Sequence, residues 1–524
     1  MTTTQQLKRQ FPRNIIAAVL SFFVLTVSAV LLTPYLVNHL GPAAYGLIPL
    51  AALLTQYVAI IASQISLAVR RFLVIEAQKP GGNPSIVFNS ALALFLTLIV
   101  VQIPIFAVVI YKVDAIFTIP PELLRDAQIL FVCSAASFLL SLLFGVFGIS
   151  IYAENRLDIS STIELSRGVG RLVFIVAFFS VFGPGLRFIG YTDLLMSIFA
   201  GLAKLYYWRK LTPELMINVR HIDVKMMKPI FKMSFWTLVN NIGALLYVRT
   251  DIWIINKFIS PVAAGQYAAI LVILNFIKQL GRLISNQFGP TTIAYCAKSE
   301  WDALRKLIQM SMKMTAVLIA VPIGVICVTA PELLKTWLGD DFVSLSPVVW
   351  LVIGHLFINV GVYPLIYCVQ PALNQVKLPG LVTFFMGIAN VTCVYTLGVA
   401  LDMGVVGVAL GGAIVLSMKN AMFTTLHGAA VLGLPKTVFI RPLMSSLLVF
   451  LLILVINWLP VANWAGFSSG YAYLGVTAAY LSAVSVVFIW FVLINTREKR
   501  LLADMIPGKV GLRLRKRAGC EDRI

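Results

Sequence analysis

The chain enters its apolar part through Ile15-Ile-Ala-Ala-Val-Leu-Ser-Phe-Phe-Val-Leu-Thr-Val-Ser-Ala-Val-Leu-Leu-Thr-Pro-Tyr-Leu-Val37, 23 residues without a charged side chain. A helix of about 20 apolar residues is long enough to cross the hydrocarbon core of a bilayer. Runs of this kind recur along the chain as far as Asn495, and the Lys and Arg residues gather between them. The sequence therefore predicts an all-α membrane protein that crosses the bilayer many times.

The composition supports this class. The 524 residues are 60% hydrophobic and 12% charged, whereas about a quarter of an ordinary soluble chain is charged. The formal net charge of +20 does not indicate a nucleic-acid partner, because Lys and Arg accumulate on the cytoplasmic loops of membrane proteins. The six cysteines show neither a CxxC pair nor a metal-ligand spacing. We expect no metal site, no cofactor and no nucleic acid.

A hydropathy window of about 19 residues predicts fourteen spans. They lie at 15–37, 46–69, 86–110, 127–151, 159–181, 188–207, 231–255, 264–288, 309–330, 346–369, 380–400, 404–426, 441–459 and 471–495. The segments on the N-terminal side of the membrane hold 31 Lys and Arg residues, and those on the opposite side hold 5. By the positive-inside rule both termini are predicted to lie in the cytoplasm.

The chain also contains an internal sequence repeat. Pro42-Ala-Ala-Tyr-Gly46 follows the first span and Pro261-Val-Ala-Ala-Gly265 follows the seventh, 219 residues later. The same offset carries Ala153 and Asn155 onto Ala372 and Asn374, and Gly168 onto Gly387. A constant register over this length indicates duplication of a six-helix unit. Because spans one and seven both run outward, the two copies are parallel and related by an axis along the membrane normal.

The repeat predicts the domain organisation. We expect an N-terminal six-helix bundle at 1–210, a cytoplasmic linker at 211–230, a C-terminal six-helix bundle at 231–435, an extra helix pair at 436–495 and a basic cytoplasmic tail at 496–524. Two such bundles enclose a central cavity, and rocking them exposes it to each side of the membrane in turn. In the tail, Arg513-Leu-Arg-Lys-Arg517 is typical of contact with anionic lipid headgroups.

Ionisable residues inside spans are costly and often mark a transport pathway. Eight ionisable residues within the predicted spans are considered as candidates: Glu164, Arg167, Arg171, Asp193, Arg249, Asp251, Lys278 and Arg282. Five are positive and three negative, a net +2 that favours an anionic substrate over a cationic drug. No phosphate-binding loop, HExxH or Ser/His/Asp grouping is present, so we expect no enzymatic activity, and energy would come from an ion gradient or from consumption of the product.

The spacing of these charges suggests a binding site. Glu164, Arg167 and Arg171 share one face of span five, and Lys278 and Arg282 share one face of span eight. If both faces line the cavity, one cationic pair from each half binds a phosphate or pyrophosphate, which arginine holds through a fork of N–H donors.

Structural roles are the alternative for each of these groups. Glu164 and Arg167 would form a local ion pair, and Lys278 or Arg282 would extend to the inner headgroups. For Asp193, Arg249 and Asp251 we expect structural pairing or coupling rather than substrate contact.

Three motifs carry a resemblance to a known family: Leu40-Gly-Pro-Ala-Ala-Tyr-Gly46, Tyr247-Val-Arg-Thr-Asp251-Ile-Trp-Ile-Ile and Gly265-Gln-Tyr267. With the layout of twelve plus two helices, they resemble the bacterial polysaccharide (O-antigen type) flippases of the multidrug/oligosaccharidyl-lipid/polysaccharide exporter superfamily, over about residues 10 to 430. The resemblance implies that a polyprenyl-pyrophosphate-linked oligosaccharide moves from the inner to the outer leaflet of the bacterial cytoplasmic membrane. Polysaccharide polymerase and glycosyltransferases are the implied partners.

Other functions stay open at this point. The lipid II flippases share the expected cationic cavity and the two additional helices, and multidrug exporters and eukaryotic-type lipid-oligosaccharide relatives share the superfamily. A non-transporting scaffold for polysaccharide-synthesis enzymes, or a membrane-embedded transferase, would use the same spans differently.

Overall fold

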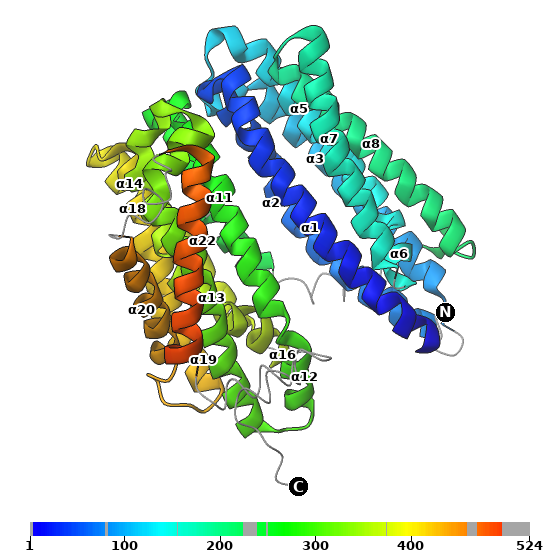
Figure 1. Cartoon of the computed structure of the whole chain (residues 1–524). Coiled ribbons are helices and arrows are strands. Elements are labelled where there is room, and N and C mark those ends of the chain that lie inside the picture. The colour runs from blue at the N-terminus through cyan, green and yellow to red at the C-terminus, as the bar shows by residue number, and fades with distance from the viewer. Residues whose placement is uncertain are drawn as a thin grey trace. The chain divides into compact units, whose positions relative to one another are not determined.

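A computed structural model of the chain describes residues 4–78, 82–154, 156–223, 238–247, 250–373, 375–457 and 469–494, and the regular structure in these segments is helical (Figure 1). The helices before residue 224 are α1 (Thr4–Leu40), α2 (Pro42–Gln78), α3 (Pro84–Tyr111), α4 (Val113–Ile116), η1 (Pro121–Leu123), α5 (Leu124–Phe147), α6 (Ile149–Ala153), α7 (Leu157–Phe182), α8 (Leu186–Leu211) and η2 (Val219–His221).

The later helices begin with the unlabelled Leu238–Tyr247. They continue with α10 (Thr250–Ile254), η3 (Ile255–Ile259), α11 (Pro261–Asn286), α12 (Gly289–Ala297), α13 (Trp301–Leu338), η4 (Asp340–Leu345), α14 (Ser346–Gly354), α15 (Leu356–Gly361), η5 (Pro364–Val369), α16 (Gln370–Ala372), α17 (Lys377–Tyr395), η6 (Thr396–Ala400), α18 (Gly404–Met418), η7 (Lys419–Thr424), α19 (Thr425–Val431), α20 (Ile440–Ile456), α22 (Gly470–Phe488) and η8 (Ile489–Leu493).

Most of the predicted spans coincide with long apolar helices. Within the described residues, 12 helices are long and apolar enough to cross a membrane, and two shorter apolar helices, Leu238–Tyr247 and Ile440–Ile456, lie where the seventh and thirteenth spans are expected. Part of the seventh predicted span, including Arg249, lies outside the described residues. The all-α, multi-spanning fold is confirmed, while the count of fourteen and the side of the termini stay predictions.

Proline and glycine set several helix boundaries. Pro42 and Pro261 are the first residues of α2 and α11, where the absence of an N–H costs no helical hydrogen bond. Gly41 and Gly183, at the turns after α1 and α7, have φ angles of +78° and +82°. Side chains rarely adopt this left-handed region, so glycine lets the chain reverse directly into the next span.

Packing divides the chain into two units. Unit 1 contains Met1–Val272 and Lys377–Gly411, and unit 2 contains Ile273–Val376 and Gly412–Ile524. In unit 1, α1 packs along α7 and α5 along α8, and in unit 2, α13 packs against α20 and α22 (Figure 1). These units follow helix packing rather than the duplicated sequence, and the boundaries predicted from the repeat at 210 and 435 stay a prediction.

Each unit has its own apolar core. In unit 1, the ring of Trp208 stacks on Phe88 at 5.6 Å between centroids and lies 4.9 Å from Phe147. In unit 2, Leu304, Ile308 and other apolar side chains of α13 are fully buried in a cluster with the residues before and within α20. The start of α20 is therefore joined to α13 through this shared buried cluster.

The two copies of the repeat meet at equivalent glycines within unit 1. A Cβ on Gly46 would lie 2.8 Å from the backbone N of Gly265, and a Cβ on Gly265 would overlap the carbonyl oxygen of Pro42. Only glycine permits such a close backbone approach. Because Gly46 and Gly265 are related by the 219-residue offset, this self-matching contact is the one expected beside a pseudo-twofold axis.

Corresponding helices also pack alike in the two copies. Gly168 in α7 accommodates the side chain of Leu25 in α1, and its counterpart Gly387 in α17 lies against Leu238–Tyr247, where a Cβ would meet the carbonyl oxygen of Gly243 at 2.7 Å. Span five thus packs on span one as span eleven packs on span seven. Asn155 and Asn374, another of the predicted pairs, lie outside the described residues.

Candidate functional site

A charged cavity of about 580 Å³ lies among the membrane-spanning helices of unit 1. Its wall includes four residues singled out from the sequence, which are Glu164, Arg167, Arg171 and Asp193. Hydroxyl groups from α2 and α5 also line it, on Thr55, Ser134, Ser137 and Ser141. The cavity therefore presents charged groups and hydroxyl groups among the membrane-spanning helices, and such hydroxyl groups can hydrogen-bond to sugars.

Arg171 and Asp193 form an ion pair across the cavity wall. Arg171 Nε donates to Asp193 Oδ1 at 2.6 Å, and Nη2 lies 3.4 Å from Oδ2. The pair joins α7 to α8, and the two side chains are 33% and 26% exposed. A guanidinium has five N–H donors, so this two-point contact leaves donors that a second anion can use.

Arg167 and Glu164 belong to a looser network on the same face of α7. Arg167 Nη1 lies 3.7 Å from Glu164 Oε2, and its Nη2 reaches Ser197 Oγ at 3.5 Å. Lys204 of α8 approaches the other oxygen of Glu164 at 3.8 Å. The local ion pair considered from the sequence is present, and the lysine joins it from a neighbouring helix.

Lys204 lies near the end of the predicted span at 188–207 and was counted with the basic residues of the cytoplasmic side, so it was not considered for the cavity; α8 continues past it to Leu211. With Lys204 included, the network holds three cations and two carboxylates. The charge near the cavity is therefore net positive, as the sequence predicts for an anion site.

Lys278 and Arg282 lie in unit 2, on the C-terminal half of α11. Lys278 is half-buried and close enough to His355 to interact electrostatically, and Arg282 is exposed near Tyr363 and Tyr367. The placement of these residues with the span-five arginines in one shared cavity stays a prediction.

Asp251 has a structural partner. Its carboxylate is buried, and Oδ2 accepts a hydrogen bond from the Tyr267 hydroxyl at 3.2 Å. This contact links α10 to α11 and uses two residues of the motifs quoted above. The predicted role of Arg249 falls outside the described residues.

Side-chain to backbone hydrogen bonds join the span ends of unit 1 that the charge pattern predicts to face outward. The buried side chain of Asn256 accepts from Thr118 N at 2.9 Å and donates to Thr118 O at 3.1 Å. Beside it, Trp253 Nε1 donates to Ile116 O at 3.2 Å and Lys257 Nζ donates to Ala115 O at 2.6 Å. Together with the Gly46–Gly265 contact, these bonds hold the first repeat against the second.

A search of the described residues for metal sites finds no group of three or more His, Cys, Asp or Glu side chains that could hold an ion. Within the same part of the chain, His355 Nδ1 lies 2.8 Å from the carbonyl oxygen of Leu351 on its own helix turn. The histidine thus has a local backbone partner.

Residues 11–291 match the family model described as polysaccharide biosynthesis protein. The chain belongs to this family. Family membership confirms the recognition made from the motifs, and the polysaccharide biosynthesis family supplies the context in which the charged cavity is interpreted below.

Two curated proteins resemble this family member. An uncharacterized membrane protein, EpsK of Bacillus subtilis, is 27% identical over 94% of this chain and 96% of its own length. A probable low-salt glycan biosynthesis flippase, Agl15 of Haloferax volcanii, is 22% identical over 52% of this chain and 55% of its own length.

Solved structures of transporters share the fold. The lipid II flippase MurJ in an inward closed conformation superimposes with a TM-score of 0.65, at 13% identity, over 92% of this chain and 99% of that chain. An inward-facing multidrug transporter of the MATE family and MOP superfamily gives a TM-score of 0.58, at 16% identity, over 80% and 94%. The hydropathy of the described helices and these likenesses make the chain a multi-pass membrane protein with the fold of these transporters, as predicted.

Proposed function

We propose that the chain flips a polyprenyl-pyrophosphate-linked oligosaccharide from the inner to the outer leaflet of the bacterial cytoplasmic membrane by alternating access. Membership in the polysaccharide biosynthesis family and the flippase named among its relatives support the substrate class. The transporter fold supports the mode of action. Polysaccharide polymerase and glycosyltransferases would act on the same lipid-linked glycan and are its proposed partners.

The observation that carries the proposal is the Arg171–Asp193 pair in a hydroxyl-lined cavity of about 580 Å³. Charged groups are rare within spans and usually mark a pathway. The guanidinium groups of Arg171 and Arg167 are suited to the oxygens of a pyrophosphate. The serine and threonine hydroxyls are suited to the first sugar residues.

The pair also suggests how the substrate binds and leaves. Without substrate, Asp193 accepts from two of the nitrogens of Arg171. This pairing lowers the free-energy cost of placing a cation within the membrane. An arriving pyrophosphate takes the remaining N–H donors and competes with Asp193 for the others. When the cavity opens to the other side, Asp193 competes with the pyrophosphate for the N–H donors of Arg171. This competition favours release of the substrate.

Alternating access assigns a role to the outer contacts of unit 1. Gly46–Gly265 and Asn256–Thr118 join the two copies of the repeat at the span ends that the charge pattern predicts to face outward. We infer that they close the outer side, and that they separate when the substrate is released there.

The lipid II flippase is the second candidate, because MurJ shares the fold over almost the whole chain. A cationic-drug exporter is less well supported, since the acidic group of the cavity, Asp193, is already paired with Arg171. A scaffold without transport activity would need neither residue for glycan synthesis.

The test compares cells that make the lipid-linked glycan with and without the chain. Deletion is expected to accumulate the glycan on the inner leaflet, and the wild-type chain to restore outer exposure. Arg171→Ala is expected to fail, whereas Asp193→Asn, which keeps the cation, is expected to retain substrate binding. If lipid II rather than the polysaccharide precursor accumulates on deletion, the second candidate replaces the first. Full function of Arg171→Ala would favour the scaffold.

A further inference from the structure

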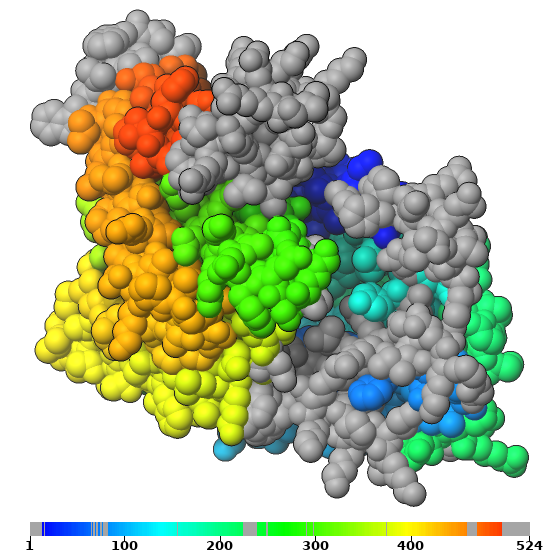
Figure 2. Space-filling model, turned by 90° about the horizontal axis from the view of Figure 1, so that it is seen from below, coloured from blue at the N-terminus to red at the C-terminus, as the bar shows by residue number. Residues whose placement is uncertain are grey.

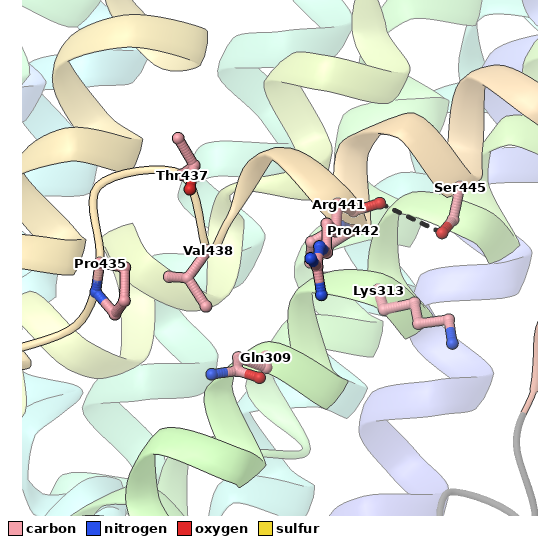
Figure 3. A pocket seen from close by; sticks show the side chains of 8 residues that line it. All are labelled: Gln309, Lys313, Pro435, Thr437, Val438, Arg441, Pro442 and Ser445. Atoms are coloured by element: carbon pink, nitrogen blue, oxygen red, sulfur yellow. Dashed lines mark hydrogen bonds between the residues drawn. The ribbon is translucent and has the colours of Figure 1, made fainter.

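A second polar pocket, of about 370 Å³, lies in unit 2 between α13 and the start of α20 (Figure 3). Gln309 and Lys313 line it from α13, and Arg441 and Ser445 line it from α20. The connection before α20 supplies the remaining wall, including the hydroxyl of Thr437. This pocket belongs to a different unit from the Arg171 cavity and needs a separate explanation.

The lining is basic. It contains two cations, Lys313 and Arg441, and none of its described lining residues is acidic. Lys313 is half-buried, and its ammonium donates to the carbonyl oxygen of Leu493 at 2.6 Å. This bond fixes the lysine between α13 and the end of η8. Arg441 is exposed on the first turn of α20 and faces the same space in Figure 3.

The pocket lies where α20 begins. The connection before it contains Lys436, and the first turns of α13 contain Arg305 and Lys306, so the charge pattern predicts the cytoplasmic side. In the view from below, the orange atoms of the α19–α20 part lie at the surface beside the green atoms of the α12–α13 part (Figure 2). A ligand can therefore enter at the membrane–water boundary.

An apolar stripe continues from the pocket along α20. Met444, Leu448, Leu451 and Val455 are 49%, 50%, 46% and 69% exposed. With Arg441 they follow the i, i+3, i+7 pattern of a single helix face. An acyl chain that extends from an anion at Arg441 into the bilayer would lie along this stripe, whereas a soluble phosphate would make no use of it.

We propose that this pocket binds the phosphate of an anionic phospholipid of the inner leaflet. Basic pockets between membrane helices on the cytoplasmic side recognise such headgroups. Arg441 supplies forked donors, Lys313 supplies a point charge, and Gln309 and Thr437 supply further donors. The bound lipid would tie the extra helix pair to α13, so that anionic lipid stabilises unit 2. This site is separate from the basic tail, for which the sequence also predicts lipid contact.

The test measures lipid binding to the full-length purified protein. Native mass spectrometry and thermal unfolding are compared in phosphatidylglycerol and in phosphatidylcholine, for the wild type and for the double variant Lys313→Gln/Arg441→Gln. The wild type is expected to retain and be stabilised by phosphatidylglycerol. Loss of two charge-assisted contacts is expected to weaken its binding about tenfold or more.

Two controls make the result specific. Lys436→Gln removes the same charge from the adjacent connection without touching the lining and is expected to bind as the wild type does. Lys313→Arg/Arg441→Lys keeps both charges and is expected to retain stabilisation, which guards against a folding defect. Equal phosphatidylglycerol binding by the wild type and the Gln double variant would overturn the proposal. Stabilisation by inorganic phosphate alone, with no lipid preference, would overturn the lipid assignment.

Discussion

Arg171 Nε lies 2.6 Å from Asp193 Oδ1, so the cation that the sequence offers to a pyrophosphate is already paired across two membrane helices. An isolated charge at this depth would be costly, and the pair lowers that cost. The pair is partly exposed to the cavity rather than sealed in a core. It can therefore exchange partners, which a purely structural ion pair would not need to do.

The pair predicts a specific stability pattern. Arg171→Ala is expected to lower the free energy of unfolding by about 1–3 kcal/mol, less than for a fully buried pair, because Asp193 is left uncompensated. Arg171→Ala/Asp193→Ala is expected to recover most of that loss, since neither charge remains. Thermal unfolding of the purified variants measures this. Additive losses in the double variant would show that the two residues are not coupled.

The glycine contact predicts a conformational effect. Gly46→Val or Gly265→Val places side-chain atoms where the two backbones meet, so the outer ends of the repeats are expected to separate. A single cysteine at the buried position Ile255, in a chain without its native cysteines, reports this as faster labelling by a membrane-impermeant maleimide. Gly475→Val is the control, because a Cβ there meets no neighbour within 4 Å. Unchanged labelling in all variants would remove the contact from the closing mechanism.

Asn256 makes a further prediction. Asn256→Ala removes both hydrogen bonds to Thr118. The loss of these bonds is expected to destabilise the contact between the two copies of the repeat by about 1–3 kcal/mol, because buried backbone groups are left unpaired. Hydrogen exchange should then accelerate at the Thr118 amide and its neighbours. Val262→Ala, on the exposed first turn of α11, serves as the control. Equal protection in the wild type and Asn256→Ala would contradict the proposed role.

Hydropathy predicted where the helices lie because crossing the bilayer requires a local run of apolar residues. It predicted their ends less well. The predicted spans 188–207 and 309–330 are shorter than the helices that contain them, α8 (Leu186–Leu211) and α13 (Trp301–Leu338). The additional turns hold the basic residues Arg209, Lys210, Arg305 and Lys306. Long basic side chains extend toward the headgroups while the backbone stays helical, so a charge does not end a helix.

The rarity of charges in spans led from the sequence to Glu164, Arg167, Arg171 and Asp193, which share one cavity wall. Their pairing was not predictable in the same way. Arg171 and Asp193 are on different helices, and their contact depends on how α7 and α8 are rotated and packed. The repeat predicted one packing contact that hydropathy could not. The offset that relates Gly46 to Gly265 also indicates which turns lie near the pseudo-twofold axis.

The most direct test is flipping in proteoliposomes that contain the purified protein and a polyprenyl-pyrophosphate-linked glycan, read out by a glycan-modifying enzyme added only outside. Arg171→Ala is compared with Arg187→Ala, which removes an arginine from the first turn of α8, where it pairs with Asp126 at 3.9 Å. We expect the wild type and Arg187→Ala to expose the inner pool of glycan, and Arg171→Ala to do so at least tenfold more slowly, because a charge-assisted contact to the pyrophosphate is lost. Equal rates for all three proteins would contradict an anion-binding role for the Arg171 cavity, and no exposure by the wild type would contradict the flippase itself.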